Sequence, residues 1–298
     1  MGLITENGVT YFVEELHSGY SQRFAVKKIL CDAVSDYQKI QILDLENFGR
    51  VLALDGIIQF SEVDEHIYHE TLVHPAMMVV NGNRKKVLIV GGGDLLAARE
   101  VLKHDDVEEV TVCDIDQSVI EVCLAHLKDM QGGVIHDKRF EFLPCDAIDF
   151  VGHEPDNSYD VIVLDRPDPV GPAEGLFSTE FYDSVRRILK PGGAVVCQSG
   201  IMFWQGSEMF DTFCYWDQHT TTTVLTITAP IWCGGPMALV MAVDGISAEE
   251  IGARVSKAVL DSPNLTKKMK FMGSPFAFAN ASMLGISMVD QLTSMRKE

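Results

Sequence analysis

Four aspartates have the type and the spacing to bind a positively charged nucleoside. They are Asp94, Asp114, Asp146 and Asp165, and each lies at or just beyond the end of a predicted strand. The carboxyl ends of parallel strands converge on one crevice in an open α/β sheet, so we expect these carboxylates to line one site. One acidic residue after a strand can equally be the N-cap of the next helix, but four in order are harder to explain in that way.

The segment 87–103, VLIVGGGDLLAAREVLK, is typical of a strand, a glycine turn and a helix, and it lies at the centre of this arrangement. The turn contains Gly91, Gly92 and Gly93. These glycines allow the backbone to approach a ligand that a Cβ would keep away. A dinucleotide fingerprint would need glycine at position 96, where Leu96 stands. A carboxylate at Asp94 would also repel a pyrophosphate, so the pattern indicates an adenosyl sulfonium.

The strand order suggests a role for each carboxylate. Asp114 ends the second strand, where an acidic residue accepts hydrogen bonds from ribose hydroxyls. Asp146 is expected to accept a hydrogen bond from the adenine amino group, beside the backbone of Cys145 or Ala147. The other two aspartates are then left facing the sulfonium end of the ligand.

The segment 164–182, LDRPDPVGPAEGLFSTEFY, is the most unusual in the chain. Three prolines and two glycines within nine residues predict a stiff loop over a strand end, which presents Asp165 and Asp168. Two carboxylates on a rigid loop suit the binding of a primary amine and the removal of its proton before it attacks an electrophilic carbon. The alternative is a purely structural turn before the helix that begins near position 179.

The composition favours a cationic small-molecule substrate. The 298 residues include 24 basic and 43 acidic ones, and the formal charge of −19 argues against binding nucleic acid or an anionic membrane, although solubility alone would explain part of it. No segment has the ~18 apolar residues of a membrane span, and the start, MGLITENG, lacks the features of a secretory signal. Seven cysteines without CxxC pairs favour reduced thiols over disulfides or zinc, so we expect a cytoplasmic protein.

Two structural units are expected to position these residues. Residues 1–62 are predicted to form a small antiparallel β subdomain, in which Asp55-Gly56 has the composition of a hairpin turn. From 85 to about 245, strands and helices alternate, which predicts a mainly parallel sheet with helices on both faces. The predicted fold class is α/β, with a seven-stranded, methyltransferase-type Rossmann domain over residues 63–298.

Several longer motifs occur in a fixed order along the chain. They are GYSQRFAVKKIL (19–30), FGRVLALDGIIQFSEVDEHIYHE (48–70), VLIVGGGD (87–94), DID (114–116), YDVIVLD with the following DP and GPAE (159–174), and LKPGGAVVCQ (189–198). Together they resemble the spermidine synthase family of aminopropyltransferases, for which GGGD followed by D-x-x-D-P-x-G-P-A is highly specific. The resemblance implies transfer of an aminopropyl group from decarboxylated S-adenosylmethionine to an amine, with release of methylthioadenosine and without a metal.

The resemblance also implies roles for individual residues and for the assembly. Contacts to the donor are implied for Gln38, His69, Asp94, Asp114 and Asp146, with Asp94 holding the aminopropyl ammonium. Binding of the diamine is implied for Tyr68, Asp165 and Asp168, with Asp165 as the base that deprotonates the attacking amine. The loop 165–180 would act as a gate, and the N-terminal region would form a homodimer or homotetramer.

The chain departs from the family's pattern where the reacting groups are expected. The family's GGGDGG is GGGDLL here, so Leu95 and Leu96 are expected to add bulk beside the sulfonium. Arg166 takes the place of a small hydroxyl residue, and Trp232 stands where the family has a tyrosine that contacts the amine. The tail segment 270–280, KFMGSPFAFAN, lacks the family's usual histidine and tyrosines.

These departures leave three interpretations of the function, of which aminopropyl transfer leads. Arg166 is always cationic, so beside Asp165 and Asp168 it would weaken the attraction for a second ammonium. It would then pair with a carboxylate of the acceptor or of intact S-adenosylmethionine, unless it points to solvent or bridges Asp168. The second interpretation is therefore an enzyme that transfers a methyl or another group from intact S-adenosylmethionine, or cyclises or cleaves it. The third is a non-catalytic nucleoside-binding paralogue, against which the two retained aspartates argue.

Overall fold

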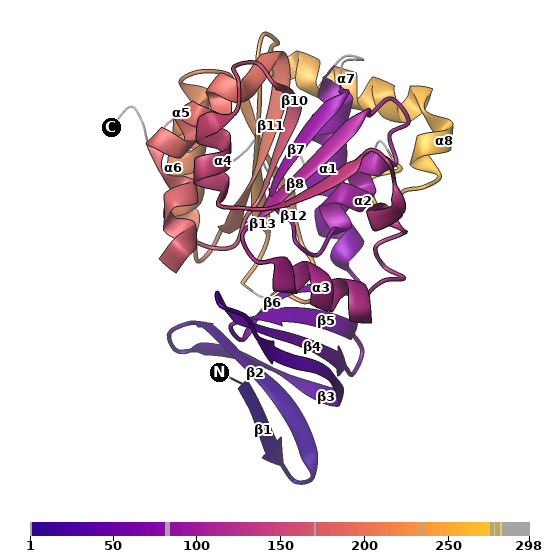
Figure 1. Cartoon of the computed structure of the whole chain (residues 1–298), viewed down its shortest axis with the longest axis vertical. Helices are drawn as coiled ribbons and strands as arrows, with labels where there is room; N and C mark the ends of the chain where they lie inside the picture. Colours follow the sequence, from indigo (N-terminus) through magenta and orange to yellow (C-terminus); the bar gives the residue numbers. More distant parts are fainter. Residues whose placement is uncertain are drawn as a thin grey trace.

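The computed structural model describes residues 2–80, 84–169, 171–232, 234–274, 277 and 281, and it contains two sheets, one below the other in Figure 1. The N-terminal sheet is an antiparallel meander of six strands in chain order, as predicted. Its strands are β1 (Gly2–Glu6), β2 (Val9–His17), β3 (Tyr20–Val34), β4 (Lys39–Leu45), β5 (Gly49–Leu54) and β6 (Ile57–Ser61).

The turn between β5 and β6 is the two-residue hairpin that its composition predicts. Asp55 and Gly56 both have positive φ, 49° and 83°, as a type I′ turn requires. Leu54 pairs directly with Ile57 across it. The first helix, α1 (Glu65–Val79), begins soon after β6 and carries the chain into the second sheet.

The second sheet has seven strands in the order β12-β13-β11-β10-β7-β8-β9, which confirms the predicted Rossmann-type α/β fold. Its strands are β7 (Lys86–Gly91), β8 (Glu109–Asp114), β9 (Phe140–Pro144), β10 (Tyr159–Asp165), β11 (Leu189–Ile201), β12 (Thr221–Ile227) and β13 (Met237–Val243). The pairs β10–β11, β10–β7, β7–β8 and β8–β9 are parallel, and β13 is antiparallel to both of its neighbours. The carboxyl ends of β9, β8, β7 and β10 therefore lie at one edge.

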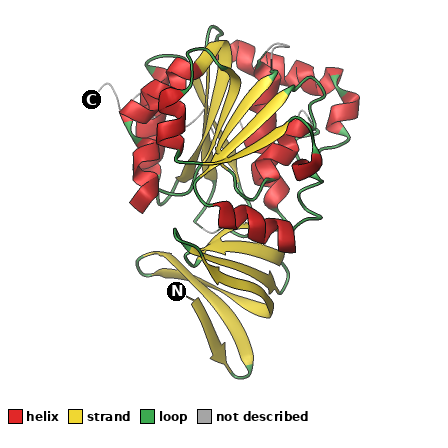
Figure 2. Cartoon of the chain, viewed as in Figure 1, coloured by secondary structure: helices red, strands yellow, loops and turns green. Residues whose placement is uncertain are grey.

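Helices cover both faces of this sheet, as Figure 2 shows. One face carries α1, α2 (Leu96–Leu102) and α7 (Ala248–Asp261), which pack on Val87 and Ile89 of β7. The other face carries α4 (Ala147–His153), α5 (Thr179–Ile188) and α6 (Gly206–Asp217), which pack on Leu88 and Val90. This alternation between two covered faces explains why residues 87–90 of β7 are all apolar. Among the described helices, none combines the length and the apolar character that crossing a membrane requires.

The helix α3 (Gln117–His126) lies between the two sheets (Figure 1). Its Val119 and Cys123 pack with Ile40 and Ile42 of β4 in one buried cluster. At the edge of this contact Arg50 bridges Glu62 and Asp129, with N–O distances of 2.7 and 2.6 Å. The N-terminal sheet is thereby fixed against the edge of the Rossmann sheet at which the predicted site lies.

One predicted boundary differs from the structure. The sequence Lys190-Pro191-Gly192-Gly193 is typical of a break between a helix and a strand, but β11 already begins at Leu189. Its pairing with β10 jumps from Tyr159–Leu189 to Val161–Ala194, so the proline and the glycines form a bulge within the ladder. Most of the tail segment 270–280 beyond Ser274 lies outside the described residues, Ala277 excepted.

The prediction that Leu95 and Leu96 crowd the sulfonium is wrong. Both side chains are buried, and neither lines the cavity described below. Leu95 belongs to the core beneath α1, whereas Leu96 fills the contact between α3 and the N-terminal sheet. Leu95 achieves this with a left-handed backbone, φ 68°, which costs a residue with a Cβ about 1–2 kcal/mol. Burial of a whole leucine offsets that strain.

Because Leu95 has a left-handed backbone, we expect glycine at position 95 to give a more stable protein than alanine, the reverse of the usual order in a helix. We expect Leu95→Gly and Leu95→Ala both to be less stable than the parent by about 2–4 kcal/mol, since a core side chain is lost. The glycine variant should be the more stable of the two by about 1 kcal/mol, because glycine adopts positive φ without strain. Urea unfolding measures all three free energies.

The control is Ala98→Gly in the middle of α2. Glycine costs about 1 kcal/mol relative to alanine in a helix interior, so there the order of stability should be reversed. Equal stability of the two position-95 variants would contradict the strained backbone at Leu95.

Candidate active site

A cavity of about 410 Å³ lies at the carboxyl ends of the central strands, between the Rossmann sheet and the N-terminal sheet. The sequence analysis predicted fourteen site residues, and thirteen of them line it. They are Gln38, Tyr68, His69, Gly91, Gly92, Gly93, Asp94, Asp114, Asp146, Asp165, Arg166, Asp168 and Trp232. The four strand-end aspartates thus share one cavity because β9, β8, β7 and β10 are adjacent and parallel.

The glycine turn after β7 allows neighbouring strand ends to come close. A Cβ on Gly91, whose φ is 78°, would lie 2.1 Å from the backbone oxygen of Asp165. A Cβ on Gly93 would lie 2.8 Å from Oδ2 of Asp114, to which the Gly93 amide donates at 3.0 Å. The ends of β10 and β8 therefore fill the space that these glycines leave. The glycines were expected to let a ligand approach the backbone, and the structure shows that they also let neighbouring strand ends approach it.

The nucleoside end of the cavity is organised around Asp114. Its carboxylate accepts backbone N–H groups of Gly93 and Asp116, at 3.0 and 2.9 Å. Burial raises the pKa of Asp114 to about 6, although these two hydrogen bonds oppose the change. Gln38 lines the cavity but donates its amide to Asp116 at 2.9 Å, as Ser35 does with its hydroxyl at 2.7 Å. Asp116, which the sequence analysis did not select, ties the N-terminal sheet to this end of the site.

The wall beyond β9 is made by Asp146, Ala147 and Ile148, and Cys145 is the predicted site residue that does not line the cavity. The Cys145 Sγ lies 2.9 Å from that of Cys113, which does line the cavity. Asp146 also caps α4 by accepting the Ile148 amide at 2.8 Å. Of the two backbones considered beside the adenine, the structure therefore favours Ala147.

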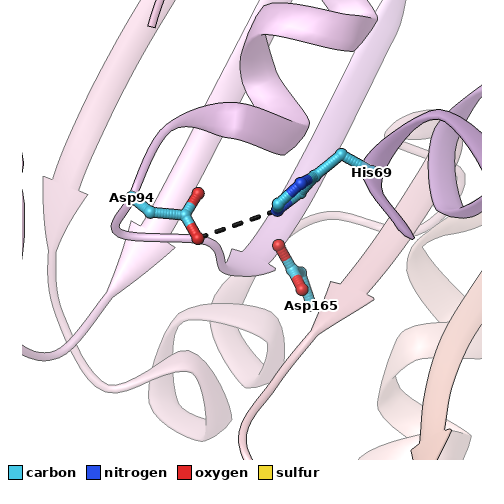
Figure 3. Close-up of side chains that lie close together, drawn as sticks. All are labelled: His69, Asp94 and Asp165. Atoms are coloured by element: carbon cyan, nitrogen blue, oxygen red, sulfur yellow. Dashed lines mark ion pairs between the residues drawn. The ribbon is translucent and has the colours of Figure 1, made fainter. Parts of the chain in front are cut away.

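His69, Asp94 and Asp165 form a compact charged cluster at the other end of the glycine turn (Figure 3). One nitrogen or oxygen of each lies within 4.8 Å of the others, and His69 Nε2 is 3.8 Å from Asp94 Oδ2. Burial alone would lower the pKa of His69, but Asp94 and Glu65 outweigh it and raise that pKa to about 10. A protonated His69 places one positive charge beside the carboxylates of Asp94 and Asp165.

A buried network holds His69 in this state. Its Nδ1 contacts Glu65 Oε2 at 3.0 Å, and Glu65 is paired with Arg99 at 2.8 Å. Burial opposes the negative charge on Glu65, but His69 and Arg99 together lower its pKa to about 2. Arg99 also contacts Glu100 at 2.8 Å. Helices α1 and α2 thus fix the position and the charge of His69.

The raised pKa of His69 predicts a pH-dependent contribution to stability. A folded-state pKa of about 10 against an ordinary value of 6.5 means that the contribution is complete below pH 6.5 and is lost as the pH rises through 10. We expect the difference in unfolding free energy between the parent and His69→Gln to be largest near pH 6.5 and to shrink toward pH 10. Urea unfolding at several pH values measures it.

His153→Gln removes an exposed histidine at the end of α4 and is the matched control, whose stability should follow the parent at every pH. A difference for His69→Gln that stays constant over the same range would show that His69 is not held as a cation.

Asp165 ends β10 and lines the cavity. Its Oδ1 accepts the Tyr68 hydroxyl at 2.6 Å, whereas its buried Oδ2 has no partner among the described residues. Burial and the nearby charge of Asp94 raise the pKa of Asp165 to about 6, against the opposing effects of His69 and Tyr68. An oriented carboxylate with one free oxygen and a pKa just below neutrality is suited to accept a proton.

Arg166 does not occupy the position expected of it. Its side chain is buried and turns toward the 3-10 helix η2 (Gly171–Phe177) and α5. There it donates to the Leu176 carbonyl and to the Tyr182 hydroxyl, and its guanidinium lies 3.5 Å from the centre of the Phe177 ring. It forms no ion pair with any carboxylate of the described chain, Asp168 included. Arg166 therefore holds the loop that follows β10 and does not bridge Asp168.

The wall opposite the glycine turn contains residues that the sequence analysis did not select. Glu14 of β2 accepts the Ile58 amide at 2.7 Å and the Gln22 side chain at 3.2 Å. Burial and the charge of Asp168 raise the pKa of Glu14 to about 7, and its two hydrogen bonds oppose this. Gln198 donates to Asp168 at 3.4 Å and keeps a buried Oε1 without a partner in the described chain.

Trp232 forms part of the same wall. Its indole lies edge-on to Tyr68, with ring centres 5.4 Å apart, and donates to the Ile58 carbonyl at 3.2 Å. The sequence around Glu14, VTYFVEELH, offers one signal, an acidic residue among apolar ones in the predicted β subdomain. The local sequence cannot predict that β2 reaches the cavity, because this depends on how the N-terminal sheet docks on the Rossmann domain.

The fold and the cavity together define an enzyme of the Rossmann class with a site for a nucleoside and an adjacent cation. A sequence profile described as "Spermine/spermidine synthase domain" matches residues 65–246, and one described as "Spermidine synthase tetramerisation domain" matches residues 10–62. The chain belongs to the spermine/spermidine synthase family, and its class of enzyme is that of the aminopropyltransferases.

Similar proteins and structures agree with this assignment. The polyamine aminopropyltransferase of Salmonella arizonae is 37% identical, over 84% of this chain and 89% of the relative, and that of Klebsiella pneumoniae is 35% identical, over 85% and 88%. Spermidine synthase from Thermotoga maritima superposes with a TM-score of 0.82 at 28% identity, over 95% and 94% of the two chains. A spermidine synthase in complex with the transition-state analogue AdoDATO gives a TM-score of 0.84, with the same identity and coverage.

Proposed function

We propose that the chain transfers an aminopropyl group from decarboxylated S-adenosylmethionine to a primary amine and releases methylthioadenosine. The observation that carries the proposal is the carboxylate of Asp165, which keeps one buried oxygen without a partner in the described chain and shares the cavity with Asp94 and Glu14. The AdoDATO complex of a similar spermidine synthase supports the choice of donor.

The donor is proposed to lie along the ends of β8 and β7. Asp114 would accept hydrogen bonds from the ribose hydroxyls, and Asp146 would accept one from the adenine amino group. Asp94 would bind the ammonium of the aminopropyl chain. Because Asp94, Asp114 and Asp165 are close together, a ligand with a sulfonium and an ammonium relieves the repulsion between them.

Asp165 is proposed to act as the general base, with Tyr68 fixing its orientation. The nitrogen lone pair of a neutral amine attacks the methylene carbon next to sulfur, the carbon–sulfur bond breaks, and its electron pair neutralises the sulfonium. The proton lost by the nitrogen passes to Oδ2 of Asp165. Since methylthioadenosine is a good leaving group, positioning and proton removal account for most of the catalysis.

The acceptor is proposed to be a diamine that lies along the wall formed by Asp168, Gln198, Trp232 and Glu14. Glu14 and Gln198 both present acceptor oxygens, and a second ammonium beside Glu14 would favour its ionised form. The position of Arg166 supports this choice, because two of its three guanidinium nitrogens donate to the Leu176 carbonyl and the Tyr182 hydroxyl, although its buried Nε has no partner in the described chain. The sequence-based argument for a carboxylate on the acceptor, or for intact S-adenosylmethionine as donor, depended on a free Arg166.

Asp165→Asn tests the proposed base. We expect kcat to fall by about 10²- to 10⁴-fold, the range of a positioned proton acceptor, while the dissociation constant of the donor changes by only a few-fold. In the parent, kcat/KM should rise with pH through about 6, where Asp165 loses its proton, and this step should vanish in the variant. Release of methylthioadenosine measured by chromatography gives both quantities.

Asp168→Asn is the comparison, since its carboxylate is proposed to bind the acceptor and not to take the proton. Its main effect should be a higher KM for the amine with the step near pH 6 preserved. Unchanged turnover in Asp165→Asn would remove Asp165 from the mechanism.

We also propose a homo-oligomer that associates through the N-terminal sheet. The match of residues 10–62 to a tetramerisation domain supports this, as does the exposure of apolar residues on the sheet. These residues are Ile4, Val9, Ile29 and Val34. Light scattering of the purified protein should give the mass of a dimer or tetramer, and a monomer at micromolar concentration would contradict the proposal.

A further inference from the structure

Aromatic side chains from two separate parts of the chain close the wall of the cavity beyond Glu14. The β2–β3 hairpin contributes His17 and Tyr20, and the turn after β11 contributes Trp204; all three line the cavity. The indole of Trp204 stacks on the His17 ring with centres 4.5 Å apart and planes at 19°, and the Tyr20 ring lies 5.3 Å away. The N-terminal sheet and the Rossmann domain therefore meet in this aromatic closure.

A bulge in β2 places Glu14 and His17 on the same side. Residues three apart in a regular strand point to opposite faces of the sheet. The register of β2 against β3 shifts between the Glu14–Gln22 pair and the His17–Tyr20 pair, and such a bulge re-aims a side chain. The stack of His17 on Trp204 consequently follows the Glu14 carboxylate along the same wall.

Trp204 is held firmly in this position. Its backbone N–H donates to the Ile201 carbonyl at 3.0 Å, and one face of the indole is covered by His17. The indole also meets the Phe203 ring edge-on, with ring centres 4.7 Å apart, and it lies against Gly234, where a Cβ would be 2.1 Å from the indole Nε1 and where φ is 105°. A substitution at Gly234 would therefore displace the indole. Because the indole is packed from several sides, it has little freedom to move aside for a longer ligand.

The buried polar atoms of this surface are two ring nitrogens, the Trp204 Nε1 and the His17 Nε2, which have no partner in the described chain. An indole nitrogen can only donate a hydrogen bond, so the Trp204 Nε1 offers nothing to an ammonium, which is itself a donor. Among the described residues of β2, Glu14 is the acidic side chain that lines the cavity.

Resting on the proposed aminopropyl transfer, we propose that Trp204 sets the upper length of the acceptor. The indole, stacked on His17 and seated on Gly234, ends the acceptor part of the cavity just beyond Glu14. It admits a diamine whose second ammonium reaches Glu14 and excludes longer amines and linear triamines. Trp204 is thus a specificity-determining residue of the reaction, distinct from the groups that carry out the chemistry.

The test compares the parent with Trp204→Ala over a series of linear diamines of increasing length and one linear triamine. Affinities are measured by calorimetry with methylthioadenosine bound, and kcat/KM is measured with the donor. In the parent, each methylene beyond the limit should cost about 10-fold or more, the usual penalty for an excess methylene in a closed pocket. Trp204→Ala should shift the limit to longer amines and bind the triamine at least about 10-fold more tightly. An unchanged length profile would overturn the proposal.

Met202→Ala is the matched control, because Met202 lies on the same turn but packs against the core of the sheet; its length profile should equal that of the parent. If Trp204→Ala fails to fold, His17→Ala loosens the stack from the other side and should shift the limit in the same direction. Absence of methylthioadenosine release by the parent with every amine would refute the proposed function. The calorimetric profile would still decide the role of Trp204, since binding needs no turnover.

Discussion

Repulsion between carboxylates that meet at the strand ends is the constraint on which the rest of the structure depends. The parallel order of β10, β7 and β8 brings Asp165, Asp94 and Asp114 into one cavity, and burial raises the pKa of Asp114 and of Asp165 to about 6. His69 supplies the compensating charge within the protein, as Figure 3 shows. Helices α1 and α2 hold that charge in place through Glu65 and Arg99. One histidine does not neutralise all of these carboxylates, and we propose that a ligand with two positive charges supplies the rest.

The acceptor side of the cavity depends on the N-terminal sheet. α3 and the Arg50 ion pairs fix this sheet beneath the strand ends, and the bulge in β2 turns Glu14 and His17 toward the cavity. Apart from Gln38, the proposed donor side is built from the Rossmann domain, whereas the proposed acceptor side needs side chains from both units. Differences in acceptor specificity within this fold can therefore arise at the contact between the units while the donor side stays the same.

Much of the fold and of the donor side could be predicted from the sequence, because both follow from local patterns. The alternating strands and helices predict the parallel sheet, and strand ends in such a sheet converge, which is why Asp94, Asp114, Asp146 and Asp165 were found together. The type I′ turn at Asp55-Gly56 follows from its composition alone.

The remaining features depend on the direction of single side chains. Leu95 and Leu96 were expected beside the ligand, but a left-handed residue at the start of α2 turns them into the core. Arg166 was expected near Asp168, but an aromatic ring and a carbonyl of η2 bind its guanidinium. Glu14, His17 and Trp204 approach one another only through a strand irregularity and the docking of two units, and neither has a local sequence pattern.

If the site balances its clustered carboxylates with a doubly cationic donor, its affinity must depend on the net charge of the donor. Isothermal titration of the protein with decarboxylated S-adenosylmethionine and with intact S-adenosylmethionine compares ligands that differ by one carboxylate near Asp94. We expect the decarboxylated form to bind more tightly, by about 10-fold or more, since a like charge is absent. Equal affinity, or a preference for the intact form, would contradict it.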